Sequence, residues 1–257
     1  MASKFILGST QPFLLYVNSK NRSNQNSPST LFNIQLAFPP LHIKRVTLLQ
    51  AIIPNTLYTF RNDKFVVNNN FDFIDSTGLP VTAVITPGSY DTADFITEFN
   101  TQLAAVSPDT YTITYNPNTL RLTITSSSAL FQILGATGPN TLHNILPFIG
   151  FNEVDTAAGT VQLAPKPINL GSPKEVFIKI GNFQAQIHNT VPKFSAMWQI
   201  SMSVPFGEIL FYEQLNTHES GIEVDQRTMN QLDIQMVDDN GDTLILDTDW
   251  SCLVRFD

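Results

Sequence analysis

The segment from Phe32 to Leu103 constrains the fold more than any other part of this 257-residue chain. Residues Leu31 to Phe38 alternate between apolar and polar types, which is the period of a strand with one buried face. Pro39-Pro40 ends this strand, because proline has no N–H group to donate to a sheet. Ile43 to Ile53 is then a long, mostly apolar run, a pattern typical of a strand that is covered on both faces. The segment is therefore suited to packing sheets, and it contains no arrangement of residues that is typical of a catalytic site.

The same segment also predicts a helix over about residues 92–104, the only substantial helix that we expect. Thr92 is the expected N-cap, and Asp94 lies in the first turn, where the helix dipole favours a negative charge. The apolar residues that follow recur at helical spacing, at Phe95, Ile96, Phe99 and Leu103. We therefore expect one side of this helix to pack against a sheet.

The rest of the chain is predicted to form short strands separated by turns. The expected strands cover residues 13–17, 65–67, 81–85, 111–115, 120–124, 176–180, 197–204, 209–212, 232–236, 243–247 and 250–256. Asn240-Gly241 is expected to form a two-residue hairpin turn, because both positions tolerate a positive φ. Many short strands with a single helix indicate an all-β sandwich. No linker divides the chain, so we predict an N-terminal arm over residues 1–12 and one domain over residues 13–257, with the long loops as insertions.

The composition favours a protein that works inside an assembly. Charged residues make up 14% of the chain, against roughly 25% in ordinary soluble proteins. A surface of amides and hydroxyls loses little solvation free energy when it is buried against a neighbour, although some sugar-binding β proteins share this property. The net charge of −8 and the scattered basic residues argue against direct binding of nucleic acid. The chain has no run of about 20 apolar residues that would span a membrane and no evident secretion signal, so we expect synthesis in the cytosol.

Each candidate chemical motif has a simpler structural interpretation. Asp238 to Asp242 (DDNGD) begins with the spacing of a calcium loop, but the flanking strands favour a hairpin turn. Cys252 is interpreted as a small buried residue in the last strand, and as the lone cysteine it cannot form an intramolecular disulfide. We predict no catalytic residue, cofactor or metal. The remaining candidates are the separated histidines His42, His143, His188 and His218 and the acid pairs Glu208/Glu213 and Asp247/Asp249, none of which has a specific signature.

Five segments, taken in order, resemble the vertex (penton) capsid proteins of double-jelly-roll DNA viruses. The nearest types are those of virophages, Polinton-like elements and related large DNA viruses of eukaryotes. The segments are Tyr16 to Arg22, Phe32 to Thr56, Ile85 to Leu103, Tyr111 to Ser126 with Phe148 to Phe151, and Leu232 to Phe256. Residues from about 152 to 220 lie outside the resemblance.

This resemblance implies a single jelly-roll β-sandwich with eight core strands, extra hairpins and the one helix. It implies a structural protein of the virion, without enzyme activity, that forms homopentamers at icosahedral vertices next to trimers of a double-jelly-roll major capsid protein. Other minor capsid proteins or a vertex fibre would be further partners, and assembly would take place inside the host cell. From position and residue type we predict an arm that contacts neighbouring capsid proteins through Lys4, Phe5, Ile6 and Leu7, and a pentamer interface at Tyr58, Trp198 and Tyr212.

Two other classes of function stay open on the sequence alone. A minor virion protein used for attachment or carbohydrate binding would present aromatic side chains such as Tyr90 on its loops. A β-sandwich hydrolase would instead gather titratable residues in a cleft. The N-terminal arm can equally be a free tail.

Overall fold

The structure is a computed structural model that describes residues 12–36, 41–127, 130–180, 187–188, 195–196, 198–215, 221–228 and 230–257. The chain divides into two compact units. The sandwich unit comprises residues 1–57 and 173–257, and the inserted unit comprises residues 58–172. The sequence predicts one domain with loop insertions over residues 13–257. The structure differs in that the longest insertion has a hydrophobic core of its own.

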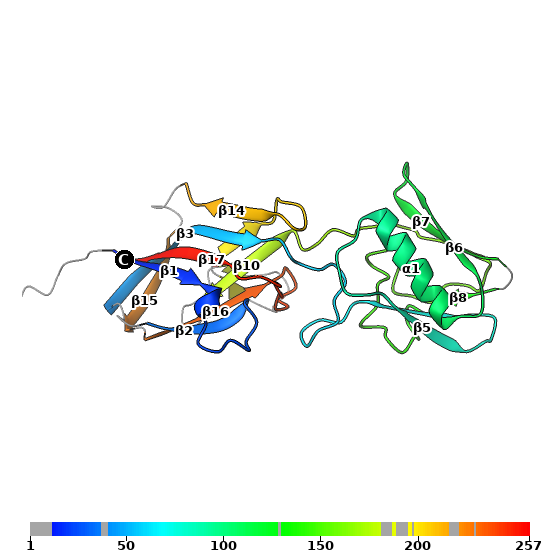
Figure 1. The fold of residues 1–257 in the computed structure, drawn as a ribbon, viewed down its shortest axis with the longest axis horizontal. Helices are drawn as coiled ribbons and strands as arrows, with labels where there is room; N and C mark the ends of the chain where they lie inside the picture. Colours follow the sequence, from blue (N-terminus) through cyan, green and yellow to red (C-terminus); the bar gives the residue numbers. More distant parts are fainter. Residues whose placement is uncertain are drawn as a thin grey trace, which may run out of the picture. The chain divides into compact units, whose positions relative to one another are not determined.

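The sandwich unit consists of two antiparallel sheets (Figure 1). The first sheet has the order β1 (Phe13–Asn18), β17 (Ser251–Phe256), β3 (Leu41–Pro54) and β14 (Ile209–Glu213), and β15 (Ile222–Thr228) also pairs with β3. The second sheet has the order β13 (Trp198–Ser201), β10 (Glu175–Ile180), β16 (Gln231–Val237) and β2 (Leu31–Gln35). The short strands β11 (Ile187–His188) and β12 (Ser195–Ala196) form an extra hairpin.

The order of these strands is that of a jelly-roll. When β14 and β15 are taken together, the unit has eight strands along the chain, and nearly every connection crosses from one sheet to the other. The first sheet then holds the first, eighth, third and sixth strands, and the second holds the fifth, fourth, seventh and second. This pattern of two Greek keys defines the jelly-roll. The predicted fold class, with eight core strands and one helix, is therefore confirmed.

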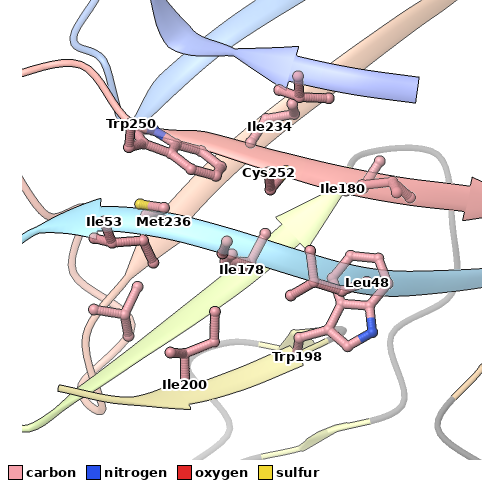
Figure 2. Packing of buried hydrophobic residues seen from close by; sticks show 14 of the residues in the cluster. Leu48, Ile53, Ile178, Ile180, Trp198, Ile200, Ile234, Met236, Trp250 and Cys252 are labelled. Atoms are coloured by element: carbon pink, nitrogen blue, oxygen red, sulfur yellow. The ribbon is translucent and has the colours of Figure 1, made fainter. Parts of the chain in front are cut away.

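The core of the sandwich unit lies between the two sheets (Figure 2). Leu48 and Ile53 of β3 face Ile178 of β10 across this core. The two β3 residues are an odd number of positions apart, and the irregular pairing with β17 at Leu49 brings both of them to the inner side. Cys252 of β17 is buried in the same cluster. Burial raises the pKa of its thiol to about 12, so the side chain stays neutral and unreactive at physiological pH. The interpretation of Cys252 as a small buried residue is confirmed.

Two loops of the sandwich unit are joined by a polar cluster around Ser19. The Ser19 Oγ donates to Asp249 Oδ1 at 2.8 Å and accepts a hydrogen bond from the backbone N–H of Trp250 at 3.0 Å. Arg22 forms an ion pair with the same Asp249 oxygen at 2.9 Å. The Trp250 indole is buried against Phe32, and its Nε1 donates to the carbonyl of Ser29 at 2.7 Å. The cluster therefore fixes the chain between β1 and β2 against the start of β17.

The inserted unit has two three-stranded sheets and the single long helix, α1 (Thr92–Val106). One sheet has the order β5 (Pro80–Val84), β4 (Asn70–Ile74), β8 (Gln132–Ile133), and the other has the order β6 (Tyr111–Asn116), β7 (Arg121–Ser126), β9 (Val161–Leu163). The helix buries Phe95, Phe99 and Leu103, as predicted, in a core that is rich in phenylalanine. Its N-cap is Asp91, whose side chain accepts a hydrogen bond from the Asp94 N–H, rather than Thr92.

Several predicted strand positions differ from the structure. Residues 65–67 and 243–247 form isolated bridges or irregular chain, whereas β4 and β15 are strands that the sequence analysis did not identify. β4 has the burial of a central strand, with Asp72 as deeply buried as its apolar neighbours. Asp72 is held by the Thr82 hydroxyl and by the backbone and side-chain amides of Asn140. A buried aspartate breaks the expected apolar pattern, and its hydrogen-bond partners lie far away in the sequence.

The DDNGD run forms a turn, as predicted, but not the two-residue hairpin turn at Asn240-Gly241. The Gly241 N–H donates to the carbonyl of Asp238, so Asp239 and Asn240 are the central residues of the turn, and Asn240 does not have a positive φ. The Asp238 carboxylate accepts hydrogen bonds from the backbone N–H groups of Asn240 and Asp242, both at 2.9 Å. Gly241 has a φ of 84°, a value that favours glycine. Burial raises the pKa of the Asp238 carboxyl, and the nearby Asp242 and Asp239 carboxylates add to this effect, which outweighs the backbone hydrogen bonds that lower it.

Replacing Asp238 with asparagine is expected to stabilise the sandwich unit at neutral pH by about 1 kcal/mol or less. Because the folded-state pKa of Asp238 is raised, the contribution of this one residue to stability is most favourable below the ordinary aspartate value of 3.8 and is lost as pH rises through the folded value. The asparagine side chain keeps an oxygen that can accept both N–H groups, and it carries no charge. Urea unfolding should therefore show a stability gain at pH 7 that disappears just below pH 3.8.

The control variant is Asp239→Asn, which removes an equal charge from the exposed neighbouring position. A gain for Asp238→Asn that is the same at both pH values, or that Asp239→Asn reproduces, would contradict the burial of a charged Asp238.

Candidate interaction surface

The outer face of the β1-β17-β3-β14 sheet carries apolar side chains that the described parts of the chain leave exposed. Phe13, Leu15 and Val17 of β1 face the core. Leu14 and Tyr16 alternate with them and therefore point outward. Ile209 and Phe211 of β14 point outward by the same alternation. We define the apolar outer face as Leu14, Tyr16, Ile52, Ile209, Phe211 and Leu253.

These residues lie side by side because of the strand register. Ile52 of β3 pairs with Phe211 of β14 on one side and with Ser251 of β17 on the other. Tyr16 of β1 pairs with Leu253 of β17 in the adjacent row. Side chains that are paired across strands have Cβ atoms about 5 Å apart and contact each other directly. The two apolar pairs therefore lie in neighbouring rows of the same outer face, and they meet diagonally at Ile52 and Leu253, with Ser251 and Gln50 as the polar residues beside them.

The side chains of this face are more exposed to solvent than apolar residues usually are. Phe211 is 72% exposed, Tyr16 60%, Leu14 55% and Ile52 40%. Leu215, which follows β14, is 94% exposed. Single exposed apolar residues are common, but a contiguous group of them is typical of a surface that binds another protein.

The other sheet presents a different kind of surface. Its outward positions are mainly polar. The apolar exceptions are Phe177 and Val237, which pair with each other and are both buried, and Leu31, which is 36% exposed on the edge strand. The polar outer face comprises Asn33, Gln35, Lys179, Gln199, Asp233 and Gln235. The sandwich unit therefore has one outer face whose exposure to water is unfavourable and one that water solvates well.

Charges on the apolar outer face are few. Arg255 of β17 forms an ion pair with Asp257 at 2.9 Å. Glu213 ends β14 opposite Gln50 of β3. Burying this face against a partner would therefore remove mostly apolar atoms from water, which stabilises association by about 25 cal/mol per Å².

The three residues predicted for the pentamer interface occupy different environments. Trp198 is 7% exposed and belongs to the sandwich core, because Trp198 and Ile200 point inward while Gln199 points outward. Tyr212 of β14 is partly buried against the same core, where burial raises the pKa of its phenol, and its hydroxyl donates to Gln214. Tyr58 is the first residue of the inserted unit and is partly buried. Their role in an interface stays a prediction, as does that of Lys4, Phe5, Ile6 and Leu7, which lie outside the described residues.

The other candidate residues have structural roles or stand apart. Within the described ranges, no group of three or more histidine, cysteine, aspartate or glutamate side chains is placed to hold a metal ion. Asp249 belongs to the Ser19 cluster. Glu208 and Glu213 stand at opposite ends of β14. In the part of the chain that the structure describes, no helix is both long and apolar enough to cross a membrane.

The exposed members of the apolar outer face were missed by the sequence analysis, although a signal for them exists. β1 reads Phe-Leu-Leu-Tyr-Val and β14 reads Ile-Leu-Phe-Tyr, so both strands are apolar on both sides. The apolar run of β3 carries the same signal, and for that strand it predicts that both faces are covered.

Comparisons with known proteins give no family assignment from sequence. No family model matches the chain, and no curated protein matches it. Two solved structures are similar: the mavirus penton protein, at 13% identity and a TM-score of 0.48 over 96% of this chain and 99% of that one, and a chain of the cryo-EM structure of the Sputnik virophage, at 13% identity and a TM-score of 0.45 over 96% and 98%. Because both TM-scores lie below 0.5, these likenesses do not assign a function to this chain.

Proposed function

We propose that the chain is a structural capsid protein that forms homopentamers at the vertices of a DNA virus shell. The observation that carries this proposal is the contrast between the apolar outer face of one sheet and the polar outer face of the other. The jelly-roll topology and the ordered segments that resemble penton proteins agree with it.

A ring of five subunits requires two different surfaces on each subunit, because every contact in a cyclic assembly of this kind is heterologous. The apolar outer face supplies one of these surfaces. The strand pattern of β3 supports this role, since its run of apolar residues is typical of a strand with both faces covered. Among the described residues, the chain covers the inner face around Ile52 and leaves the outer one exposed, and a neighbouring subunit would cover the outer one.

The remaining parts of the proposal concern partners. The low charge content of the chain limits the solvation free energy that is lost when further surface is buried. We propose that trimers of a double-jelly-roll major capsid protein contact the pentamer from outside, and that the N-terminal residues Lys4 to Leu7 take part in this contact. The location would be the capsid vertex of the virion.

The test is the mass of the purified protein in solution, measured by light scattering and native mass spectrometry, with negative-stain imaging of the same sample. We expect a species of five times the 28.6-kDa chain mass and ring-shaped particles, either alone or after mixing with the major capsid protein of the same virus. A protein that stays monomeric at high concentration and in the presence of that partner would contradict the proposal.

A further inference from the structure

β14 is an edge strand of the first sheet of the sandwich unit (Figure 1). The N–H of Gln214 donates to the carbonyl of Leu49 in β3 at 2.9 Å. Successive residues of an antiparallel strand direct their backbone groups to opposite sides. The even-numbered residues of β14 therefore bond to β3, and the N–H and carbonyl groups that point away from it belong to Ile209, Phe211 and Glu213. Within the described residues, no strand pairs with this free side of β14.

The free edge of β14 has none of the features that usually keep a sheet edge from pairing. Natural edge strands are protected by lysine, by proline or by a β-bulge. Ile209 to Glu213 contains neither lysine nor proline, and its pairing with β3 has no shift in register. Its outward side chains are apolar and exposed, with Phe211 at 72% and the following Leu215 at 94%. An edge of this kind is suited to pairing with a further extended segment.

The charges beside this edge favour a segment that has a basic residue and no acidic one. Glu208 and Glu213 stand at the two ends of β14, and both are exposed. Opposite charges on neighbouring strands stabilise their pairing, and like charges oppose it. Residues 1–11 carry the apolar run Phe5-Ile6-Leu7 next to Lys4, and they contain no acidic residue. At the other edge of the same sheet, β1 contains no acidic residue, so Lys4 favours β14 over β1.

This segment of one subunit does not reach the β14 edge of the same subunit. β1 runs parallel to β3, and Phe13 lies in the row of Val46. β14 lies beside the other end of β3, with Glu213 opposite Gln50. The spacing of strands and residues in a sheet puts roughly 23 Å between Phe13 and the free side of β14 at Glu213. The residues that connect Leu7 to Phe13 span only about 20 Å when fully extended, and the chain enters β1 from the end of the sheet that is farther from β14.

We propose that β14 binds residues Lys4 to Leu7 of a second copy of the chain as an added strand. The inference rests on the proposed function, because the second copy is a neighbouring subunit of the pentamer. Neighbouring subunits then contact each other through the side chains of the apolar outer face and also through backbone hydrogen bonds at the β14 edge. The added strand has a free edge of its own, which leaves it available for the proposed contact with the major capsid protein.

Pairs of introduced cysteines test this contact in the full-length protein. Ile209→Cys on β14 is combined in turn with Phe5→Cys, Ile6→Cys and Leu7→Cys, and each variant is mildly oxidised. We expect at least one combination to give a ladder of disulfide-linked chains on a non-reducing gel, because the two cysteines of each bond belong to different copies. The native Cys252 does not interfere, since burial raises its pKa to about 12. The control replaces Ile209→Cys with Gln199→Cys, at an exposed position of the edge strand β13 in the other sheet, and should give no ladder.

Light scattering of the wild-type protein separates the failure of this inference from the failure of the proposed function. Rings without a ladder overturn the added strand and leave the pentamer in place. A ladder without rings supports the strand pairing and contradicts the pentamer. A disulfide that forms within one chain would place the segment on its own subunit and overturn the inference. Monomers that give no ladder contradict both proposals.

Two adjacent proline variants distinguish strand pairing from apolar contact alone. Because alternate residues of a strand direct their N–H groups to opposite sides, only one of Ile6→Pro and Leu7→Pro removes an N–H that faces β14. Hydrogen exchange at single amides should show the Phe211 N–H protected in the assembled wild type, with the Leu210 N–H, which faces β3, as the internal reference. One proline is expected to speed exchange at Phe211 by about tenfold, and the other by less than about twofold. Equal effects of the two prolines, or an unprotected Phe211 amide in the wild-type assembly, overturn the inference.

Discussion

Replacing Trp250 with alanine is expected to lower the free energy of unfolding of the sandwich unit by about 4 kcal/mol. The indole is 2% exposed and packs edge-on against Phe32, with ring centroids 6.2 Å apart. Alanine would leave a cavity between the two sheets and would also deprive the Ser29 carbonyl of the indole N–H that lies 2.7 Å away. This loss is a large fraction of the stability of a typical domain, so we expect a partly unfolded sandwich unit at physiological temperature.

The measurement is hydrogen exchange on the full chain, read separately for the strands of the sandwich unit and for the inserted unit. Two milder variants isolate the hydrogen bond. Trp250→Phe and Trp198→Phe both replace a buried tryptophan of the same core, but the Trp198 indole N–H has no partner in the described structure. Trp250→Phe should therefore cost about 1–2 kcal/mol more. Equal costs for the two variants would show that the Ser29 bond contributes nothing.

The position of a strand and its buried side could be predicted well where one face is buried and the other is polar. β16 shows this clearly, since Leu232, Ile234 and Met236 alternate with polar residues and all three are buried. The helix was equally clear from the spacing of Phe95, Phe99 and Leu103. In both cases the local period of the sequence decides which side is buried.

The division of the chain into two units could not be predicted from local patterns. The boundary after Leu57 falls within an apolar stretch, and Leu57 and Phe60 are both fully buried, each in a different core. Periodicity shows that a residue is buried, but it does not show in which core. The second boundary, after Ser172, does lie in a short Gly-Ser-Pro run that is typical of a linker, but a run of this length is equally typical of an ordinary loop.

The Ser19 cluster was present in the sequence as two unrelated motifs. Ser19 to Arg22 and Asp249-Trp250 were both singled out, but nothing local indicates that residues 230 positions apart share a hydrogen bond. The jelly-roll topology brings them together, because β1 and β17 are antiparallel neighbours and Asn18 pairs with Ser251. Contacts of this kind follow from the order of the strands, which a single sequence does not reveal.

The predicted pentamer-interface residues were chosen by position and aromatic residue type, and these alone did not show that Trp198 packs in the core. Tryptophan is common both in cores and in interfaces, so its presence alone does not decide between them. Strand alternation does decide, since the inward position of Trp198 follows from Gln199 and Ser201 on the other side of β13. The same reasoning selects Phe211 rather than Tyr212 as the exposed aromatic residue of β14.

Phe211→Asp is therefore expected to abolish assembly while leaving the subunit folded. Phe211 is 72% exposed in the single chain and pairs with Ile52 on the side of the apolar outer face that the edge strand β14 forms. In the monomer, the aspartate would be solvated and would change the free energy of unfolding by only about 0.5 kcal/mol. In the assembled ring it would be a buried, unpaired charge, which costs several kcal/mol at each interface and raises the dissociation constant by at least about 10²–10³-fold.

The matched control is Gln199→Asp, which introduces the same charge at an exposed position of the polar outer face. Light scattering and negative-stain imaging should show rings for the wild type and for Gln199→Asp, and folded monomers for Phe211→Asp, with similar circular dichroism spectra for all three. Rings that persist in Phe211→Asp would remove the apolar outer face from the interface. If only Gln199→Asp lost its rings, the contact would belong to the other sheet. An added carboxylate prevents assembly only at a position that becomes buried when the ring forms.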